Sequence, residues 1–467
     1  MRLSKMSPAL VTSDHYQVAI VGGGIAGLTL ALAFERLNIS FVLFEARESI
    51  TSDQGASIGL LPNGLRILEQ LGVLEDIEKQ TSPLKTWNHL DCNGDLIAAV
   101  DALGYYQESL GYGGLFLERT KVLQSMYDHL KAKDCVRTSA RITLIENQDD
   151  HVMLQASDGS SITSDVVIGA DGVRSCVRAH IDQSGDPKQK MRNTSCFTTR
   201  FACVYGISTA LPGIYEGQCF SVYRKEASIL IFTGKEGIVF WFVFEDLGEE
   251  LPYEKTPRFK DDDIEATCQS VIHLKLTEEI EFGDIYARKT VATKIALEEG
   301  VAETWHHDRL VIVGDAAHKI SKMVPNAAMG ANQAMESSTV LVNKLQGVLK
   351  ADGPVSGELL HKAISEYVEM RKPRTEAIKD KAAMVCRAQM CFDGPPTAMI
   401  NELPSLTDGD WLFRGFAGLS GAPTIEGLAV TPRAKFYDQA IGRFWQKVKA
   451  RGAGGVRGTN NDLFGLA

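Results

Sequence analysis

The sequence has no long uninterrupted apolar run. Its most apolar stretch, Ile238–Phe244 (IVFWFVF), is far shorter than the ~20 residues that a membrane-spanning helix needs. The opening residues, MRLSKMSPALVTSD, lack the apolar core of a secretory signal peptide. We therefore expect a soluble, cytoplasmic protein without a membrane span, in which residues 1–15 form a flexible leader.

Cysteine pairs and basic clusters are also missing. The nine cysteines are scattered without a C-x-x-C pair, which is typical of reduced intracellular thiols and argues against a metal site. The formal net charge is −10 and no basic run occurs. Nucleic acid is therefore not an expected partner, because few cations are available to displace phosphate counterions. A small lipophilic substrate fits this charge balance better.

The length and the alternation of strand and helix patterns predict an α/β fold with more than one part. A chain of 467 residues exceeds what one hydrophobic core usually supports. The predicted parts are a Rossmann-like cofactor-binding domain (16–84, 115–185 and 295–350), an inserted antiparallel β-sheet substrate domain (85–114 and 186–294), a helical C-terminal part (351–449) and a mobile tail (450–467). Within the helical part, we expect Pro373 to interrupt a helix over Leu359–Met390.

The segment QVAIVGGGIAGLTLALAFERLNISFVLFEAR predicts a strand, a glycine-rich turn, a helix and a second strand. Gly22 permits the tight turn, Gly24 lets the backbone approach a pyrophosphate, and Gly27 lets the helix pack closely on the strand. Glu45 ends the second strand, where a carboxylate binds ribose hydroxyls and repels a 2′-phosphate. This unit favours FAD or NAD over NADP and does not by itself separate the first two.

Two further apolar strands end in acidic turns. Asp171 follows the strand in VVIGADGVRSCVR, and Asp315 follows the strand in RLVIVGDAAH, ahead of a helix from about Gly330. A carboxylate at the C-terminal end of such a strand lies where α/β sheets bind ligands. Asp315 could bind a polyol, and the helix N-terminus could stabilise negative charge on a flat ring. This logic favours FAD, since NAD has no ribityl chain. Asp171 could equally cap its own turn.

Together these stretches resemble the FAD-dependent monooxygenases of the aromatic-hydroxylase type, often called class A. The segments GASIGLLPNGLRILEQLGVL and GDAAHKISKMVPNAAMGANQAME are similar to the fungal secondary-metabolite branch that includes the paxilline epoxidase. The resemblance spans Gln17 to Pro373. It implies FAD contacts from Glu45, Gly59, Arg119, Asp315 and Ala328, the last beside the isoalloxazine. The Ala327–Gly330 loop is bulkier than the Gly-Gln-Gly-rich loop of many relatives.

Arg200 and Tyr223 are the candidate catalytic residues. Strand alternation in CFTTRFACVYGIS places Arg200 on the face of Ala202 and Val204, either as an edge-strand arginine reaching solvent or as a site residue. The resemblance favours an arginine that faces the substrate. A tyrosine in a strand usually packs, and only the resemblance implies catalysis by Tyr223. His318 lies in a packed turn and is expected to be structural.

The resemblance implies a reaction in which NADPH or NADH transiently reduces FAD and O₂ then forms a flavin hydroperoxide. The oxygen would epoxidise or hydroxylate a terpenoid, meroterpenoid or indole alkaloid. A second G-x-G-x-x-G for the nicotinamide nucleotide is not present, which agrees with transient binding. The alternatives are an FAD-dependent reductase of prenyl chains on the same fold and a non-catalytic flavoprotein or NAD-binding scaffold.

Overall fold

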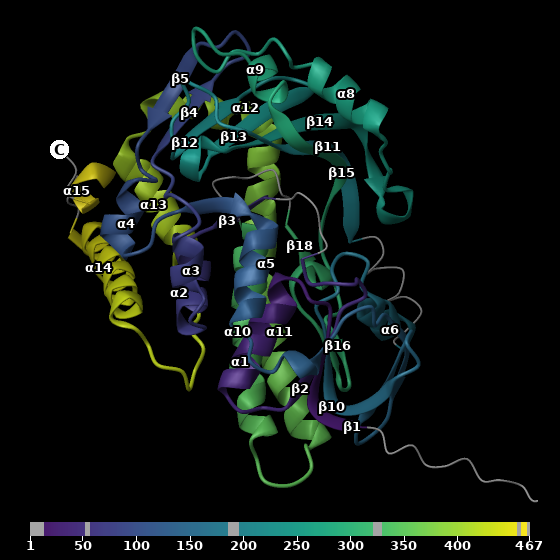
Figure 1. Cartoon of the computed structure of the whole chain (residues 1–467). Helices are drawn as coiled ribbons and strands as arrows, with labels where there is room; N and C mark the ends of the chain where they lie inside the picture. The colour runs from purple at the N-terminus through teal and green to yellow at the C-terminus, as the bar shows by residue number, and fades with distance from the viewer. Residues whose placement is uncertain (1–13, 52–56, 185–195, 321–328, 455–458, 465–467) are drawn as a thin grey trace, which may run out of the picture.

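The computed structural model describes residues 14–51, 57–184, 196–320, 329–454 and 459–464. Two eight-stranded sheets lie one above the other and are linked by long helices (Figure 1). The predicted leader is almost wholly outside the described residues, and the first strand begins at Asp14. Among the described helices, none is both long and apolar enough to cross a bilayer.

The first sheet is built on parallel strands, and its central part has the order β16-β17-β10-β1-β2-β7. Four apolar strands form its middle, as the sequence pattern predicts, and they are buried because helices cover them. The strands are β1 (Asp14–Val21), β2 (Phe41–Phe44), β7 (Val136–Arg137), β8 (Ile142–Asn147), β9 (Val152–Ala156), β10 (Ser161–Gly169), β16 (His306–His307) and β17 (Leu310–Ile312).

The helices of this part are α1 (Ile25–Arg36), α5 (Arg119–Asp128), α6 (Cys176–Ser184) and α10 (Met329–Leu349). Helix α1 is apolar nearly all round, which suits its burial between the sheet and α10. The C-terminal residue of α10, Leu349, accepts a hydrogen bond from Gln17 at the start of β1. Helix α10 therefore ends at the edge of the sheet where the parallel strands begin, and it begins at the opposite edge.

The second sheet has the order β18-β15-β11-β14-β13-β12-β4-β5. It is antiparallel except that β12 pairs in parallel with β4. Its strands are β4 (Thr86–Leu90), β5 (Leu96–Val100), β11 (Phe197–Ser208), β12 (Gln218–Val222), β13 (Ala227–Thr233), β14 (Val239–Pro252), β15 (Lys289–Val301) and β18 (His318–Lys319). The expected boundary at 294/295 falls inside β15, because β15 stays paired with β11 as far as Gly300.

Shorter elements join and cover the two sheets. Strands β3 (Ser57–Leu60) and β6 (Leu115–Glu118) form a two-stranded ribbon between them, followed respectively by α2 (Pro62–Gln70) and α5. Helices α8 (Asp261–Gln269) and α9 (Phe282–Tyr286) pack on the outer face of the second sheet around Trp241. Helices α3 (Leu74–Glu78) and α4 (Tyr105–Leu110) complete this part.

In the C-terminal part, one helix differs from the sequence expectation. Helix α11 (Gly357–Gln389) runs unbroken through Pro373. The carbonyl that Pro373 cannot bond belongs to exposed Glu369, where it is open to solvent. The end of α14 (Pro432–Gly454) and α15 (Asn460–Phe464) fall within the segment predicted to be a mobile tail. Phe464 of α15 packs edge-on against Phe416 of α13. The remaining helices are α12 (Pro395–Glu402) and α13 (Asp408–Leu419).

Candidate functional site

The candidate site lies where four parallel strands end together. Register pairs Val21 with both Phe44 and Gly169, and Gly169 with Ile312. The turns that follow these residues are therefore adjacent at one edge of the first sheet. Glu45, Asp171 and Asp315 all lie in or beside these turns, so the structure brings together the three acidic turns that the sequence singles out.

The glycine turn is shaped by close backbone contacts. Gly22 has a φ of +107°, and a Cβ there would lie 2.5 Å from the Ala170 carbonyl oxygen of the adjacent turn. A Cβ on Gly27 would overlap the Gly22 carbonyl, so the helix packs directly on the turn. Gly24 is different, because the atom nearest to its added Cβ is Nη2 of Arg119, at 3.6 Å. A guanidinium therefore lies beside the N-terminus of α1, where an anion would bind.

Glu45 is anchored to the same turn. Its Oε2 accepts a hydrogen bond from the Gly23 N–H at 2.7 Å, and its Oε1 accepts one from the Arg47 N–H at 2.9 Å. The carboxylate is thereby fixed beside the glycine turn, at the position that a ribose-binding acid takes in this kind of fold.

Asp171 serves its own helix. Its Oδ2 accepts from the backbone N–H of Cys176 at 2.7 Å and of Val177 at 3.4 Å, at the start of α6. This is the turn-capping role that the sequence left open. Asp315 lies in a short turn after β17 and forms an ion pair with Lys319 on β18.

The other predicted FAD contacts lie on or near α10. Asn332 of α10 donates to the Gly59 carbonyl at 3.1 Å and accepts from the Leu61 N–H at 3.1 Å. The β3–α2 turn is therefore tied to the first part of α10. Ala328, predicted beside the isoalloxazine, lies outside the described residues.

Two helix N-termini point to this edge of the sheet. A Cβ on Gly314 would lie 3.1 Å from the Cβ of Ala26 on α1 and 3.4 Å from that of Ala334 on α10. Ser338 of α10 also donates to the Ala26 carbonyl at 3.2 Å. The N-terminal turn of α1 thus lies beside the second and third turns of α10, and the N-termini of both helices carry partial positive charge. A glycine turn without side chains, a fixed carboxylate, an arginine and two helix dipoles fit a long anionic dinucleotide.

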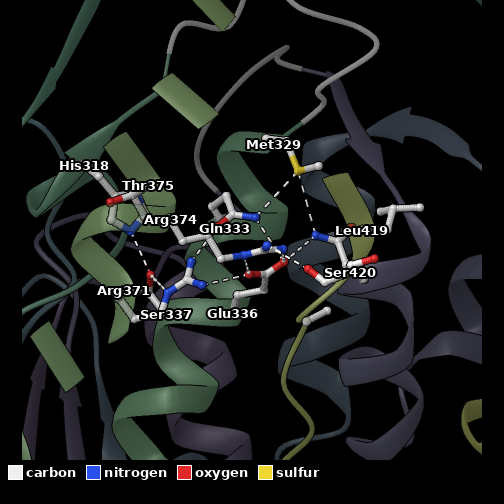
Figure 2. Close-up of polar contacts among 12 residues, drawn as sticks. His318, Met329, Gln333, Glu336, Ser337, Arg371, Arg374, Thr375, Leu419 and Ser420 are labelled. Atoms are coloured by element: carbon white, nitrogen blue, oxygen red, sulfur yellow. Dashed lines mark hydrogen bonds and ion pairs between the residues drawn. The ribbon is translucent and has the colours of Figure 1, made fainter. Parts of the chain in front are cut away.

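Behind this edge lies a largely buried polar cluster, which Figure 2 shows. Glu336 of α10 accepts from Arg371 Nη1 at 2.8 Å and from Arg374 Nε at 2.8 Å, both on α11. Its other oxygen accepts from Asn63 at 2.7 Å and from Gln333 at 3.0 Å. Although burial alone would raise it, the two guanidiniums hold the pKa of Glu336 below its ordinary value. The glutamate is therefore ionised.

His318 belongs to the edge of this cluster, as Figure 2 shows. Its Nε2 lies 2.8 Å from Ser337 Oγ, which also accepts from Arg371 Nε at 3.1 Å. Burial, assisted by nearby Arg371, lowers the pKa of His318 to about 3. A neutral, buried, hydrogen-bonded ring agrees with the structural role expected from the sequence.

Arg200 does not lie on the face that strand alternation predicts. A β-bulge between Thr199 and Phe201 breaks the alternation of β11. The guanidinium lies over the ring of Phe392, 4.8 Å from its centroid, and Phe201 contacts the same ring edge-on at 5.9 Å. Arg200 therefore shares a side with Phe201. It makes a bidentate ion pair with Asp246 on β14, at 3.0 and 3.1 Å, while its contact with Phe392 joins the second sheet to the C-terminal part.

Tyr223 belongs to an aromatic stack at the other end of the second sheet. Its hydroxyl lies 3.0 Å from Nδ1 of His89, whose ring is sandwiched between Trp87 and Trp411 at 5.5 and 5.4 Å. Burial raises the pKa of the Tyr223 hydroxyl and lowers that of His89 to about 3. Both groups are neutral at ordinary pH.

Aromatic residues are frequent between 190 and 245, a composition that suits an apolar substrate cover, but most of them are core residues. Of those between 190 and 245, only Tyr205 and Phe242 are half-buried. They are register partners on β11 and β14, and both pack toward the core that the second sheet shares with the cofactor-binding part. Neither stood out in the sequence, because cross-strand register cannot be read from one strand.

The buried cluster was also missed in the sequence. Glu336 and Gln333 are three residues apart on α10, and Arg371 and Arg374 are three apart on α11, which places each pair on one helix face. Polar and charged residues three positions apart within a predicted helix were the signal from which such a cluster could have been suspected.

A strand-turn-helix nucleotide cradle beneath a separate, largely antiparallel sheet defines a dinucleotide-binding α/β oxidoreductase. The profile of the FAD binding domain family matches residues 15–382. The FAD-dependent monooxygenase ausM of Aspergillus calidoustus is 35% identical over 435 residues, covering 92% of each chain. The FAD-dependent monooxygenase olcE of Penicillium canescens is 36% identical over 382 residues, covering 80% of this chain and 81% of that one.

Solved structures share the fold. Klebsiella pneumoniae HpxO complexed with FAD and uric acid matches with a TM-score of 0.67 and 21% identity over 86% of this chain and 96% of that one. The p-nitrophenol 4-monooxygenase PnpA of Pseudomonas putida matches with a TM-score of 0.69 and 19% identity over 87% and 99%. The chain belongs to the class A FAD-dependent monooxygenases, in the fungal secondary-metabolite branch that its sequence resembles.

Proposed function

We propose that this enzyme inserts one oxygen atom of O₂ into a small lipophilic substrate at the expense of NADPH or NADH. The balanced reaction is substrate + O₂ + NAD(P)H + H⁺ → oxygenated substrate + H₂O + NAD(P)⁺. The product is an epoxide or an alcohol of a terpenoid, meroterpenoid or indole alkaloid. The observation that carries the proposal is the cradle of Gly22, Gly24, Glu45 and Arg119 in a chain that belongs to the FAD-dependent monooxygenases.

The chain's own residues would hold the cofactor along this edge of the sheet. Gly22, Gly24 and Gly27 let the pyrophosphate approach the N-terminus of α1, where Arg119 supplies a positive charge. The Glu45 carboxylate would accept hydrogen bonds from the ribose hydroxyls.

Further along the cofactor, Asp315 would bind the ribityl region and Gly59 would contact the flavin. Ala328, which lies outside the described residues, is proposed as a further flavin contact. Asp171 shapes the turn beside Gly22 through its cap on α6. When bound, the flavin accepts hydride from the nicotinamide and mediates oxygen transfer from O₂.

The second sheet covers the substrate. The half-buried rings of Tyr205 and Phe242 offer an apolar surface directed toward the cofactor-binding part, and they exclude water from it. Arg200 and Tyr223 remain the candidate catalytic donors. Because Arg200 is paired with Asp246, it is held in one geometry, from which its remaining N–H groups can donate to a substrate oxygen.

The test uses the purified protein with FAD, reduced nicotinamide, ¹⁸O₂ and candidate terpenoids or alkaloids, with the products analysed by mass spectrometry. We expect a product heavier by one ¹⁸O atom. A product that gains two hydrogens without label would identify the prenyl-chain reductase instead. Failure of the protein to bind FAD at all would overturn the assignment.

The variants Arg200→Met and Tyr223→Phe test the two catalytic candidates. We expect slower oxygenation with unchanged FAD reduction in the absence of substrate. Glu254→Gln, on the exposed turn after β14, serves as the surface control. Turnover equal to that of the parent enzyme in both variants would remove these residues from the catalytic mechanism.

A further inference from the structure

The buried cluster around Glu336 does not balance its charges. One ionised carboxylate meets the guanidiniums of Arg371 and Arg374, and its remaining partners, Asn63 and Gln333, are neutral amides. Among the described neighbours, His318 is neutral. One positive charge is therefore left over, where Glu336 is fully buried, Arg371 is 2% exposed and Arg374 is 22% exposed.

Adjacent ion pairs do not cancel this excess. Lys319 is paired with Asp315 beside the cluster, and Arg66 is paired with Asp438 at 2.8 Å on its other side. Each of these pairs is neutral as a unit. The excess charge is thus specific to the three residues Glu336, Arg371 and Arg374.

The cluster is connected to the end of α10 that faces the cofactor edge. Glu336 lies seven residues after Met329, the first residue of α10, which corresponds to roughly 10 Å along a helix. The Met329 sulfur lies 3.8 Å from Asn63 Nδ2 and 3.6 Å from Gln333 Nε2, and these amides bind Glu336. Figure 2 shows this continuous line from Met329 to the two arginines. Asn63, Gln333 and Met329 are themselves buried, so the field of the cluster is screened less along this line than it would be in bulk water.

We propose that the Glu336–Arg371–Arg374 cluster is a buried electrostatic tuning element whose single excess positive charge favours the reduced, anionic form of the bound flavin. The dipole of α10 acts in the same direction. These three are positioning residues, since none of them needs to touch the cofactor. The inference rests on FAD binding, and it does not depend on the substrate in the proposed function.

A purely mechanical role is the rival explanation. Arg374 donates to the backbone carbonyls of Ser420 and Gly418 at 2.8 and 3.2 Å, which holds the segment after α13 against α11. If the cluster were only a clamp, each substitution would shift the flavin midpoint potential according to the number of contacts it removes. If the cluster tunes charge, the direction of the shift follows the sign of the change in net charge.

The experiment is anaerobic reductive titration of the FAD-loaded full-length enzyme, without substrate, against a reference dye. Glu336→Gln raises the net charge of the cluster, and we expect a more positive midpoint potential. Arg374→Gln removes the excess, and we expect a more negative one. The double variant Glu336→Gln/Arg374→Gln restores the original net charge, and we expect its potential to return toward that of the parent. Arg374→Lys keeps the charge and is the matched control.

Thermal unfolding and the flavin-to-protein ratio are recorded for every variant. Equal midpoint potentials in Glu336→Gln and Arg374→Gln, or shifts of the same sign, would overturn the proposal. A double variant whose potential differs from that of the parent by more than either of these single variants would also overturn it, because a mechanical clamp predicts that result. Should Glu336→Gln fail to fold, Arg374→Gln against Arg374→Lys still decides the sign. ¹⁸O incorporation by the parent enzyme is unaffected by any of these outcomes, so the proposed function is tested separately.

Discussion

At the scale of single residues, the cofactor cradle depends on glycines, which have no side chain. Gly22 and Gly27 bring the turn, the helix and the adjacent Ala170 turn closer together than any side chain would allow. Gly24 is not crowded by the protein in the same way, which leaves its backbone accessible beside Arg119. The three glycines therefore have two different physical roles, close packing and ligand approach.

Substitution of Gly27 by Ala tests the packing role. The added methyl group would overlap the Gly22 carbonyl, so we expect a loss of about 3 kcal/mol in the free energy of unfolding and weaker FAD binding. Gly347→Ala is the matched control, because it lies in α10 with nothing within 4 Å of its added Cβ. It should stabilise the protein by about 0.5–1 kcal/mol. Urea unfolding and FAD titration of the apoprotein measure both, and equal stability of the two variants would contradict this account.

At the scale of elements, α11 shows how tertiary packing overrides a local signal. A proline inside a helix removes one hydrogen bond and crowds the preceding turn. Tyr367, Arg371 and Thr375 lie on the buried face on either side of Pro373, and their contacts hold the helix in register. Pro373 itself and Glu369 are exposed, so water can bind the unpaired carbonyl.

Substitution of Pro373 by Ala should therefore stabilise the protein. Restoring the hydrogen bond contributes up to ~3 kcal/mol to the free energy of unfolding, whereas the greater freedom of the unfolded chain lowers it by about 1 kcal/mol. We therefore expect the free energy of unfolding to rise by about 1–2 kcal/mol. Pro395→Ala, at the first turn of α12, is the comparison. A proline is well tolerated there, and its loss should be neutral or slightly destabilising. Chemical denaturation measures both effects. If Pro373→Ala were less stable than the parent, the Glu369 carbonyl would have to make a stabilising interaction that depends on the proline.

At the scale of the whole molecule, two buried neutral histidines make stability depend on pH. Burial holds the pKa of both His89, in the second sheet, and His318, beside the buried cluster, at about 3, against an ordinary value of 6.5. Between these values the unfolded chain binds protons that the folded one does not. Stability is therefore fully present above pH 6.5 and falls as the pH drops toward 3.

Between pH 6.5 and 5.5, each of these histidines should lower the free energy of unfolding by about 1 kcal/mol. His89→Phe keeps an aromatic ring between Trp87 and Trp411, and it should reduce this decrease by about 1 kcal/mol. His273→Asn, at an exposed position, is the control and should leave the decrease unchanged. Urea unfolding at the two pH values decides the matter, and the same pH dependence in His89→Phe and the parent would refute the prediction.

The sequence alone determined the cofactor-binding half of this protein. Each of its signals is local: a glycine spacing, an apolar strand, or a carboxylate directly after a strand. Parallel strands end at one edge, so local signals of this kind place Glu45, Asp171 and Asp315 together. Membership in the family followed from the same stretches.

Only the tertiary structure decided the surroundings of Arg200, the packing of α15 on α13 and the buried cluster. A bulge that inverts a strand face depends on pairing with β14 and β15, which one strand does not reveal. Glu336 finds its partners 35 residues away at Arg371 and 273 residues away at Asn63. Contacts across such separations form only after the helices have packed, because burial, rather than any local preference, makes them favourable.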